Sequence, residues 1–252
     1  MTDTHCHLTD PRIEEQLPSV LARAAAAGVG RMITIGTGLA DDEAAIALCG
    51  RLGNVRCAIG VHPNYTAETE MADLPRLREL QGAAPVVALG EMGLDYHYDR
   101  APREKQKAVF EFQLQLAVEF NRPVVIHCRE ATEDCLAVLR GFPGVRADFH
   151  CFTGSMAEAR QILDAGYWLG FTGAVTFKKN DELREVVKFT PMDRLLVETD
   201  APYLTPEPMR KQKVNEPALV VHVARLVALL KGMEYSEFER VVEANASGFF
   251  GW

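Results

Sequence analysis

Eight short apolar runs alternate with helical patterns along this chain, and that alternation restricts the possible folds more than any other feature. The runs are rich in β-branched residues, as expected of buried strands. A strand can pair in parallel with its successor only through a long crossover connection, so the alternation is typical of parallel α/β folds. The expected strands are residues 2–7, 31–36, 56–61, 86–91, 123–127, 146–151, 167–172 and 194–199.

Eight strand–helix units in 252 residues predict an α/β fold of the (β/α)8 TIM-barrel type, with residues 1–252 as a single domain. The alternative is an open doubly wound sheet, but the glycine-rich first turn of the nucleotide-binding sheets is missing. Near the end of the chain, Asn215-Glu216-Pro217 predicts a helix start, with Asn215 as the capping residue and Pro217 near the first helical position.

Composition restricts the partners and the compartment. The formal net charge of −8 argues against a protein held to nucleic acid by bulk electrostatics, although a local basic rim stays possible. The six cysteines lack the regular spacing of a disulfide framework. No apolar run approaches the roughly 20 residues of a spanning helix, and no signal segment is evident. We expect a soluble cytoplasmic protein with reduced thiols, no membrane contact and no obligate protein partner.

Histidines and carboxylates fall at the ends of the predicted strands. They are His5, His7, His62, Glu91, His127, His150, Glu198 and Asp200. In a barrel the carboxyl ends of the strands meet at one mouth, so these residues are expected to lie together. Polar groups clustered in an apolar barrel end would be costly without partners, and a bound metal would supply them.

Strand alternation predicts which side chains face the mouth. His5 and His7 are two residues apart and are expected to project to the same side, and the same spacing applies to Glu198 and Asp200. The cysteines beside the histidines, which are Cys6, Cys128 and Cys151, are then expected to point away as small core residues.

Six motifs in order along the chain resemble the TatD family of metal-dependent deoxyribonucleases, in the amidohydrolase superfamily. They are Thr4-His5-Cys6-His7-Leu8, Gly60-Val61-His62-Pro63, Gly90-Glu91-Met92-Gly93-Leu94-Asp95-Tyr96, Pro123-Val124-Val125-Ile126-His127-Cys128-Arg129, His150-Cys151-Phe152-Thr153-Gly154 and Glu198-Thr199-Asp200-Ala201-Pro202-Tyr203-Leu204. The third and the last are specific, and the resemblance spans essentially the whole chain. Two departures concern substrate contacts: Asn64 where the family often has a second histidine, and Lys211-Gln212-Lys213-Val214 in place of Arg-Gly-Lys-Arg.

The resemblance implies two divalent ions, magnesium or manganese, with zinc also suited to imidazole-rich ligands. One ion would be held by His5, His7, Glu91 and Asp200, and the other by Glu91, His127 and His150, with Glu91 shared. Such a pair lowers the pKa of a bound water and offsets charge developing on a phosphate. Asp200 is the candidate to orient or deprotonate that water. His62 is expected to contact the phosphate or protonate the leaving oxygen, and Glu198 to position the water or a neighbouring ligand.

The predicted function is a metal-dependent DNase, an ester hydrolase that trims single-stranded DNA from the 3′ end. Four cations after the predicted strands, Arg129, Lys178, Lys211 and Lys213, are the candidate phosphate contacts. Two alternatives stay open on the residues alone. One is a small-molecule amidohydrolase or phosphoesterase, because the same metal site serves carbonyl and phosphoryl centres. The other is a protein that binds metal without catalysis.

Overall fold

The computed structural model of the chain describes residues 1–98 and 100–252. Its strands are β1 (Thr2–Cys6), β2 (Arg31–Ile35), β3 (Val55–Ile59), β4 (Val86–Asp95), β5 (Val124–Arg129), β6 (Ala147–Phe149), β7 (Trp168–Phe171) and β8 (Leu195–Val197). Its α-helices are α1 (Pro11–Glu14), α2 (Leu17–Ala26), α3 (Leu39–Cys49), α4 (Pro75–Leu80), α5 (Arg103–Phe120), α6 (Thr132–Leu139), α7 (Met156–Asp164), α8 (Asp181–Phe189), α9 (Val220–Leu230) and α10 (Tyr235–Phe250). Short 3-10 turns are η1 (Pro63–Tyr65), η2 (Gly173–Thr176), η3 (Met192–Arg194) and η4 (Pro217–Leu219).

The strand order confirms the predicted fold class. Hydrogen-bonded neighbours follow chain order from β1 to β8 in one eight-stranded sheet. The pairs β1–β2, β3–β4, β4–β5, β5–β6 and β7–β8 are all parallel. Parallel strands in sequential order, each connected to the next through helical segments, are the pattern of the (β/α)8 TIM-barrel fold.

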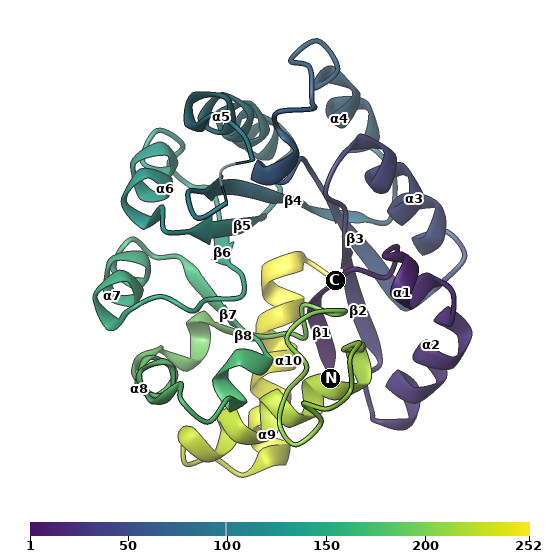
Figure 1. The fold of residues 1–252 in the computed structure, drawn as a ribbon, viewed down its shortest axis with the longest axis vertical. Coiled ribbons are helices and arrows are strands. Elements are labelled where there is room, and N and C mark those ends of the chain that lie inside the picture. Colours follow the sequence, from purple (N-terminus) through teal and green to yellow (C-terminus); the bar gives the residue numbers. More distant parts are fainter. Residues whose placement is uncertain (99) are drawn as a thin grey trace. The chain divides into compact units, whose positions relative to one another are not determined.

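By contact density the chain divides into two compact units, Met1–Thr34 with Cys151–Trp252, and Ile35–His150. In the unit Ile35–His150, helices α3 to α6 lie along one side of strands β3 to β6 (Figure 1). All ten residues of β4 are buried, as expected of a strand covered on both faces. The side chains of Phe110 and Leu114 on α5 are fully buried and supply part of this core.

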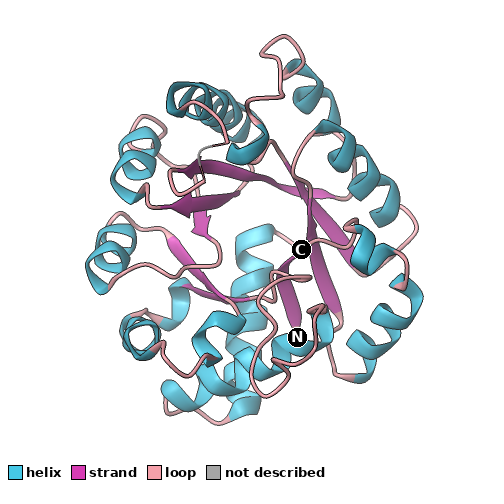
Figure 2. Cartoon of the chain, in the orientation of Figure 1, coloured by secondary structure: helices cyan, strands magenta, loops and turns pink. Residues whose placement is uncertain are grey.

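The unit Met1–Thr34 with Cys151–Trp252 joins the two ends of the chain. Helix α10 packs beside β1 and β8, and the ring of Phe249 meets that of Trp168 edge-on at 5.5 Å. Figure 2 shows the helices of the chain in cyan and its strands in magenta. Arg31 at the start of β2 hydrogen-bonds to Glu243 of α10. These contacts hold β1, β2 and β8 against the last helix, α10. They thereby also hold in place the residues that follow β1 and β8.

Two strand boundaries differ from the sequence prediction in ways that affect the site. Strand β4 continues to Asp95, so Glu91 lies inside the strand and not at its end. Strand β8 ends at Val197, and Asp200 adopts a positive φ of 55°. The expectation that Glu198 and Asp200 share one face of a strand is therefore wrong, because the backbone has already left the extended conformation.

The predicted helix start is confirmed, because Pro217 opens the 3-10 turn η4 that leads into α9, but Asn215 is not its cap. The side-chain Nδ2 of Asn215 donates to the carbonyls of Thr199 at 2.9 Å and Tyr203 at 2.6 Å. The chain then passes through the 3-10 turn η4 before α9 begins at Val220. Asn215 thus satisfies two main-chain carbonyls of the segment after β8.

None of the helices within residues 1–98 and 100–252 is both long enough and apolar enough to cross a lipid bilayer.

Candidate metal centre

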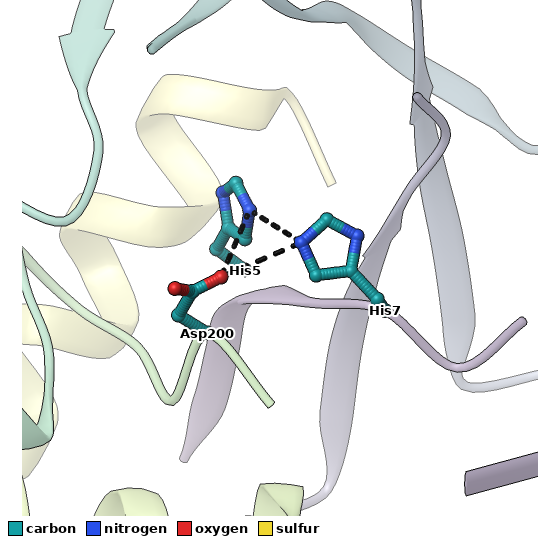
Figure 3. A group of neighbouring side chains, drawn as sticks. All are labelled: His5, His7 and Asp200. Atoms are coloured by element: carbon teal, nitrogen blue, oxygen red, sulfur yellow. Dashed lines mark hydrogen bonds and ion pairs between the residues drawn. The ribbon is translucent and has the colours of Figure 1, made fainter. Parts of the chain in front are cut away.

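His5, His7 and Asp200 form a first cluster of possible metal ligands, and Figure 3 shows all three side chains pointing toward one another. The Nε2 atoms of His5 and His7 lie 3.4 Å apart. The Oδ1 atom of Asp200 lies 3.7 Å from Nε2 of His5 and 3.4 Å from Nε2 of His7. The prediction that the two histidines project to the same side is confirmed, although His7 lies just past the end of β1.

Main-chain and side-chain hydrogen bonds hold this cluster together. The amide of Asp200 donates to the carbonyl of His5 at 2.9 Å, and that of His7 to the carbonyl of Ala201 at 2.7 Å. The fully buried carboxyl of Asp3 accepts from the Thr199 amide at 2.9 Å and from its hydroxyl at 2.6 Å. Burial raises the pKa of Asp3 to about 8, against the opposing effect of these hydrogen bonds. Asp3 therefore fixes β1 to the segment that carries Asp200.

The second cluster gathers three imidazoles around a single carboxylate oxygen. Oε1 of Glu91 lies 2.7 Å from Nε2 of His150, 2.8 Å from Nδ1 of His127 and 3.5 Å from Nε2 of His62. Burial acts to raise the pKa of Glu91, but the histidines outweigh it and hold that pKa well below its usual range. Glu91 is thus an anion that its surroundings are built to stabilise.

Hydrogen bonds on the far sides of the rings decide which nitrogen of each histidine faces Glu91. Nε2 of His127 lies 2.9 Å from Oδ2 of Asp95, which can only accept when ionised, so the Nδ1 atom is left for the cluster. Burial lowers the pKa of His127, but the hydrogen bonds to Asp95 and Glu91 raise it to about 9. The charge of the imidazolium therefore balances Glu91 until a cation replaces its proton.

In His62 the other ring nitrogen, Nε2, faces the cluster. Its Nδ1 accepts a hydrogen bond from the backbone amide of Asn64 at 3.0 Å, so that nitrogen carries no proton. The proton of the neutral ring must then sit on Nε2, which lies 3.2 Å from Nδ1 of His127. His62, Glu91 and His127 are close enough to share a cation. The Nε2 proton nevertheless makes His62 a hydrogen-bond donor to the cluster.

Asp95 is a functional candidate that the sequence reasoning missed. It stands in the third of the six motifs, but no role was predicted for it. The signal is its spacing from Glu91: four residues along one strand place both on the same face of β4. Its other oxygen, Oδ1, accepts from the amides of His97 and Tyr98, both at 3.0 Å, so Asp95 also sets the course of the loop that follows.

The remaining predicted residues lie as follows. Glu198 is fully buried; its Oε1 accepts from the Cys151 amide at 2.6 Å, and its Oε2 lies 3.4 Å from Oγ1 of Thr4. The four candidate phosphate contacts, Arg129, Lys178, Lys211 and Lys213, are exposed. The buried thiol of Cys6 points to the carbonyl of Ile33, whereas Cys128 and Cys151 are half-buried and not full members of the core.

The donor atoms fit a divalent cation. The clusters combine imidazole nitrogen with carboxylate oxygen, a mixture that suits manganese or zinc and, through the carboxylates, magnesium. In the grouped residues one ligand atom from each lies within 4.8 Å of the others. An acceptor on the far side of His127 is the arrangement that metal-binding histidines usually have. The structure therefore supports divalent metal binding.

Metal binding is expected to stabilise the folded chain. A ligand present at about 100 times its dissociation constant adds about 2.7 kcal/mol to the free energy of unfolding. For a chain of this size that is a rise in Tm of about 5–10 °C. Thermal unfolding with and without Mn²⁺, after dialysis against a chelator, measures the shift. Equal melting temperatures in the wild type, with and without saturating Mn²⁺, would contradict a metal centre.

Comparison with known proteins agrees with this chemistry. The family model described as TatD related DNase matches residues 2–251. The metal-dependent hydrolase YabD of Bacillus subtilis is 41% identical over 250 residues, covering 98% of each chain. The 3′-5′ ssDNA/RNA exonuclease TatD of Cronobacter sakazakii is 38% identical, covering 99% of this chain and 97% of its own.

A solved structure shares the fold. YJJV, a TatD homologue from Escherichia coli K12, superimposes with a TM-score of 0.94 at 28% identity, covering 100% of this chain and 98% of that one. The likeness in sequence and structure extends over the two units alike, from β1 to the last helix.

Proposed function

This chain belongs to the family of TatD-related DNases, and from that premise we propose that it is a nuclease that removes nucleotides from the 3′ end of single-stranded DNA. Its family makes it a metal-dependent hydrolase. The observation that carries the proposal is the convergence of His62, His127 and His150 on one oxygen of Glu91. The exonuclease name of a 38% identical relative supports nucleic acid as the substrate. Residues 1–252 are proposed to act as one hydrolase domain.

We propose two divalent ions, magnesium or manganese, with zinc as a further option. His5, His7 and Asp200 would bind one ion, and His127 and His150 the other. The family pattern assigns Glu91 to both. Bound there, such ions lower the pKa of a water and offset the negative charge of a phosphodiester. The lowered pKa of Glu91 supports this role, because a ligand carboxylate must be ionised.

The side chains around these ligands then have separate tasks. Asp200 orients the attacking water and accepts its proton. His62 donates the Nε2 proton to the leaving oxygen, which its hydrogen bond from the Asn64 amide keeps available. Glu198 accepts a hydrogen bond from the backbone amide of Cys151. Because Cys151 follows His150 in the chain, this hydrogen bond positions His150 as a ligand. The phosphates of the bound strand are contacted by four exposed cations, which are Arg129, Lys178, Lys211 and Lys213.

Oligonucleotides labelled at the 5′ end test the proposal. With Mn²⁺ or Mg²⁺, a ladder that shortens from the 3′ end is expected on single strands, with duplex DNA degraded more slowly. RNA of the same sequence, added in parallel, decides between the two nucleic acids. The Glu91→Ala variant is the control and should leave every strand intact. Intact DNA and RNA beside hydrolysis of a small amide or phosphoester would show that the nuclease proposal is wrong.

A further inference from the structure

Among the described residues three tyrosine side chains are exposed, and each lies close in sequence to a residue of a candidate ligand cluster or to its neighbour. Each follows a site residue by three places and donates its backbone amide to that residue. The pairs are Tyr65 with the carbonyl of His62 at 3.0 Å, Tyr98 with Oδ1 of Asp95 at 3.0 Å, and Tyr203 with the carbonyl of Asp200 at 2.8 Å. Their exposed fractions are 43%, 49% and 49%. The exposed tyrosine rings are thus concentrated just past the carboxyl ends of strands, where α/β folds bind their ligands.

The three rings differ in what already covers them. The guanidinium of Arg12 lies 4.6 Å from the ring centre of Tyr203, and that of Arg100 lies 5.5 Å from the ring centre of Tyr98. Tyr65 has no cation over its ring within residues 1–98 and 100–252. Its described ring neighbour is His62, tilted by 60° with the ring centres 5.8 Å apart. Tyr65 is therefore a partly exposed ring beside the proposed proton donor, and no described cation lies over it.

The backbone that carries Tyr65 is fixed by hydrogen bonds. The hydroxyl of Thr66 donates to the carbonyl of Pro63 at 2.8 Å, and that of Thr69 to the carbonyl of Tyr65 at 3.0 Å. The amine of Lys105 donates to the carbonyl of Ala67 at 3.0 Å, which places a positive charge on the same loop. A ring held in place loses little conformational freedom when a flat ligand stacks on it.

We propose that Tyr65 is the stacking platform for an unpaired nucleobase that flanks the scissile phosphate. The inference rests on the proposed function and deepens it. Aromatic side chains stack on any base, because every base has a π face, and this gives binding without sequence preference. A base on Tyr65 would bring its own phosphate beside Nε2 of His62. Bases inside a duplex cannot stack there, so the same contact favours single strands.

The test removes the ring and the base separately. A base stacked on Tyr65 contributes about 5- to 140-fold to binding, the range observed for base–aromatic stacking. Tyr65→Ala should raise KM by that factor on a normal strand. The increase should vanish on strands with an abasic residue at the terminal or penultimate position, because the partner of the ring is already missing. Tyr65→Phe and Tyr65→Trp should restore binding, and Tyr65→Leu should not.

Phe189→Ala provides a matched control. Phe189 is also a partly exposed ring, but it ends α8 ahead of β8, at the amino end of that strand. Its loss should leave KM unchanged on every strand. Equal KM for Tyr65→Ala and wild type, or an increase of the same size on abasic strands, would overturn the stacking proposal while cleavage itself continued. If the wild type cleaves no strand at all, the proposed function fails instead, so the two failures are distinguishable.

Discussion

Replacement of Glu91 by glutamine is expected to lower kcat/KM by more than about 100-fold. Loss of a partner outside the ligand shell costs about 10–100-fold in metal affinity or activity, and Glu91 is a central donor. Glutamine keeps the size of the side chain but removes the charge on which His127 and His150 converge at 2.8 and 2.7 Å. It also presents an amide donor to ring nitrogens that would bind a cation.

The measurement pairs activity with metal content. Mn²⁺ bound to Glu91→Gln after gel filtration should fall together with kcat/KM on a single-stranded oligonucleotide. Glu243→Gln is the matched control, because it removes a carboxylate that pairs with Arg31, apart from both ligand clusters. It should keep metal content and activity near those of the wild type. A Glu91→Gln protein with full metal content and full activity would remove Glu91 from the centre.

The second large effect concerns folding. Gly93 adopts a φ of +137° in the middle of β4, opposite His127 of β5. A Cβ atom at this position would lie 2.1 Å from the carbonyl oxygen of His127, and backbone cannot move away as a flexible side chain would. Gly93→Ala is therefore expected to cost about 3–5 kcal/mol in the free energy of unfolding, or to prevent folding.

Urea unfolding of Gly93→Ala and Gly53→Ala makes the comparison direct. A Cβ atom at Gly53 meets nothing within 4 Å, and its φ lies outside the left-handed region, so this control should stay within about 1 kcal/mol of the wild type. Equal midpoints for the two variants would show that β4 and β5 can separate without loss of stability, against the close pairing described above.

The sequence predicted the strands well, because strand order depends on apolar runs that are visible one at a time. All eight expected strands overlap observed ones, with ends that differ by a few residues. The predicted and observed ends differ most at the carboxyl end of β4, and that of β8 also differs. A positive φ at Asp200 and the extension of β4 to Asp95 are set by contacts between segments distant in sequence, such as the pairing of Asp95 with Arg129 on β5.

The candidate ligands could also be predicted, because histidines and carboxylates at strand ends are rare enough to stand out. Which nitrogen of each histidine carries the proton could not be predicted. The nitrogen of His62 that carries the proton depends on a backbone amide two residues away, and that of His127 on Asp95, thirty-two residues earlier in the chain. Nothing in the sequence marks such hydrogen-bond partners, because they meet the histidines only when the chain folds.

The hydrogen bond from the Asn64 amide to Nδ1 of His62 does not depend on the side chain at position 64. The donor belongs to the main chain, so nineteen of the twenty amino acids supply it equally. A change of the side chain at position 64 therefore leaves the proton on His62 where it is, although Nδ2 of Asn64 also lies 3.4 Å from Oδ2 of Asp95. Proline alone, having no amide hydrogen, would remove this hydrogen bond.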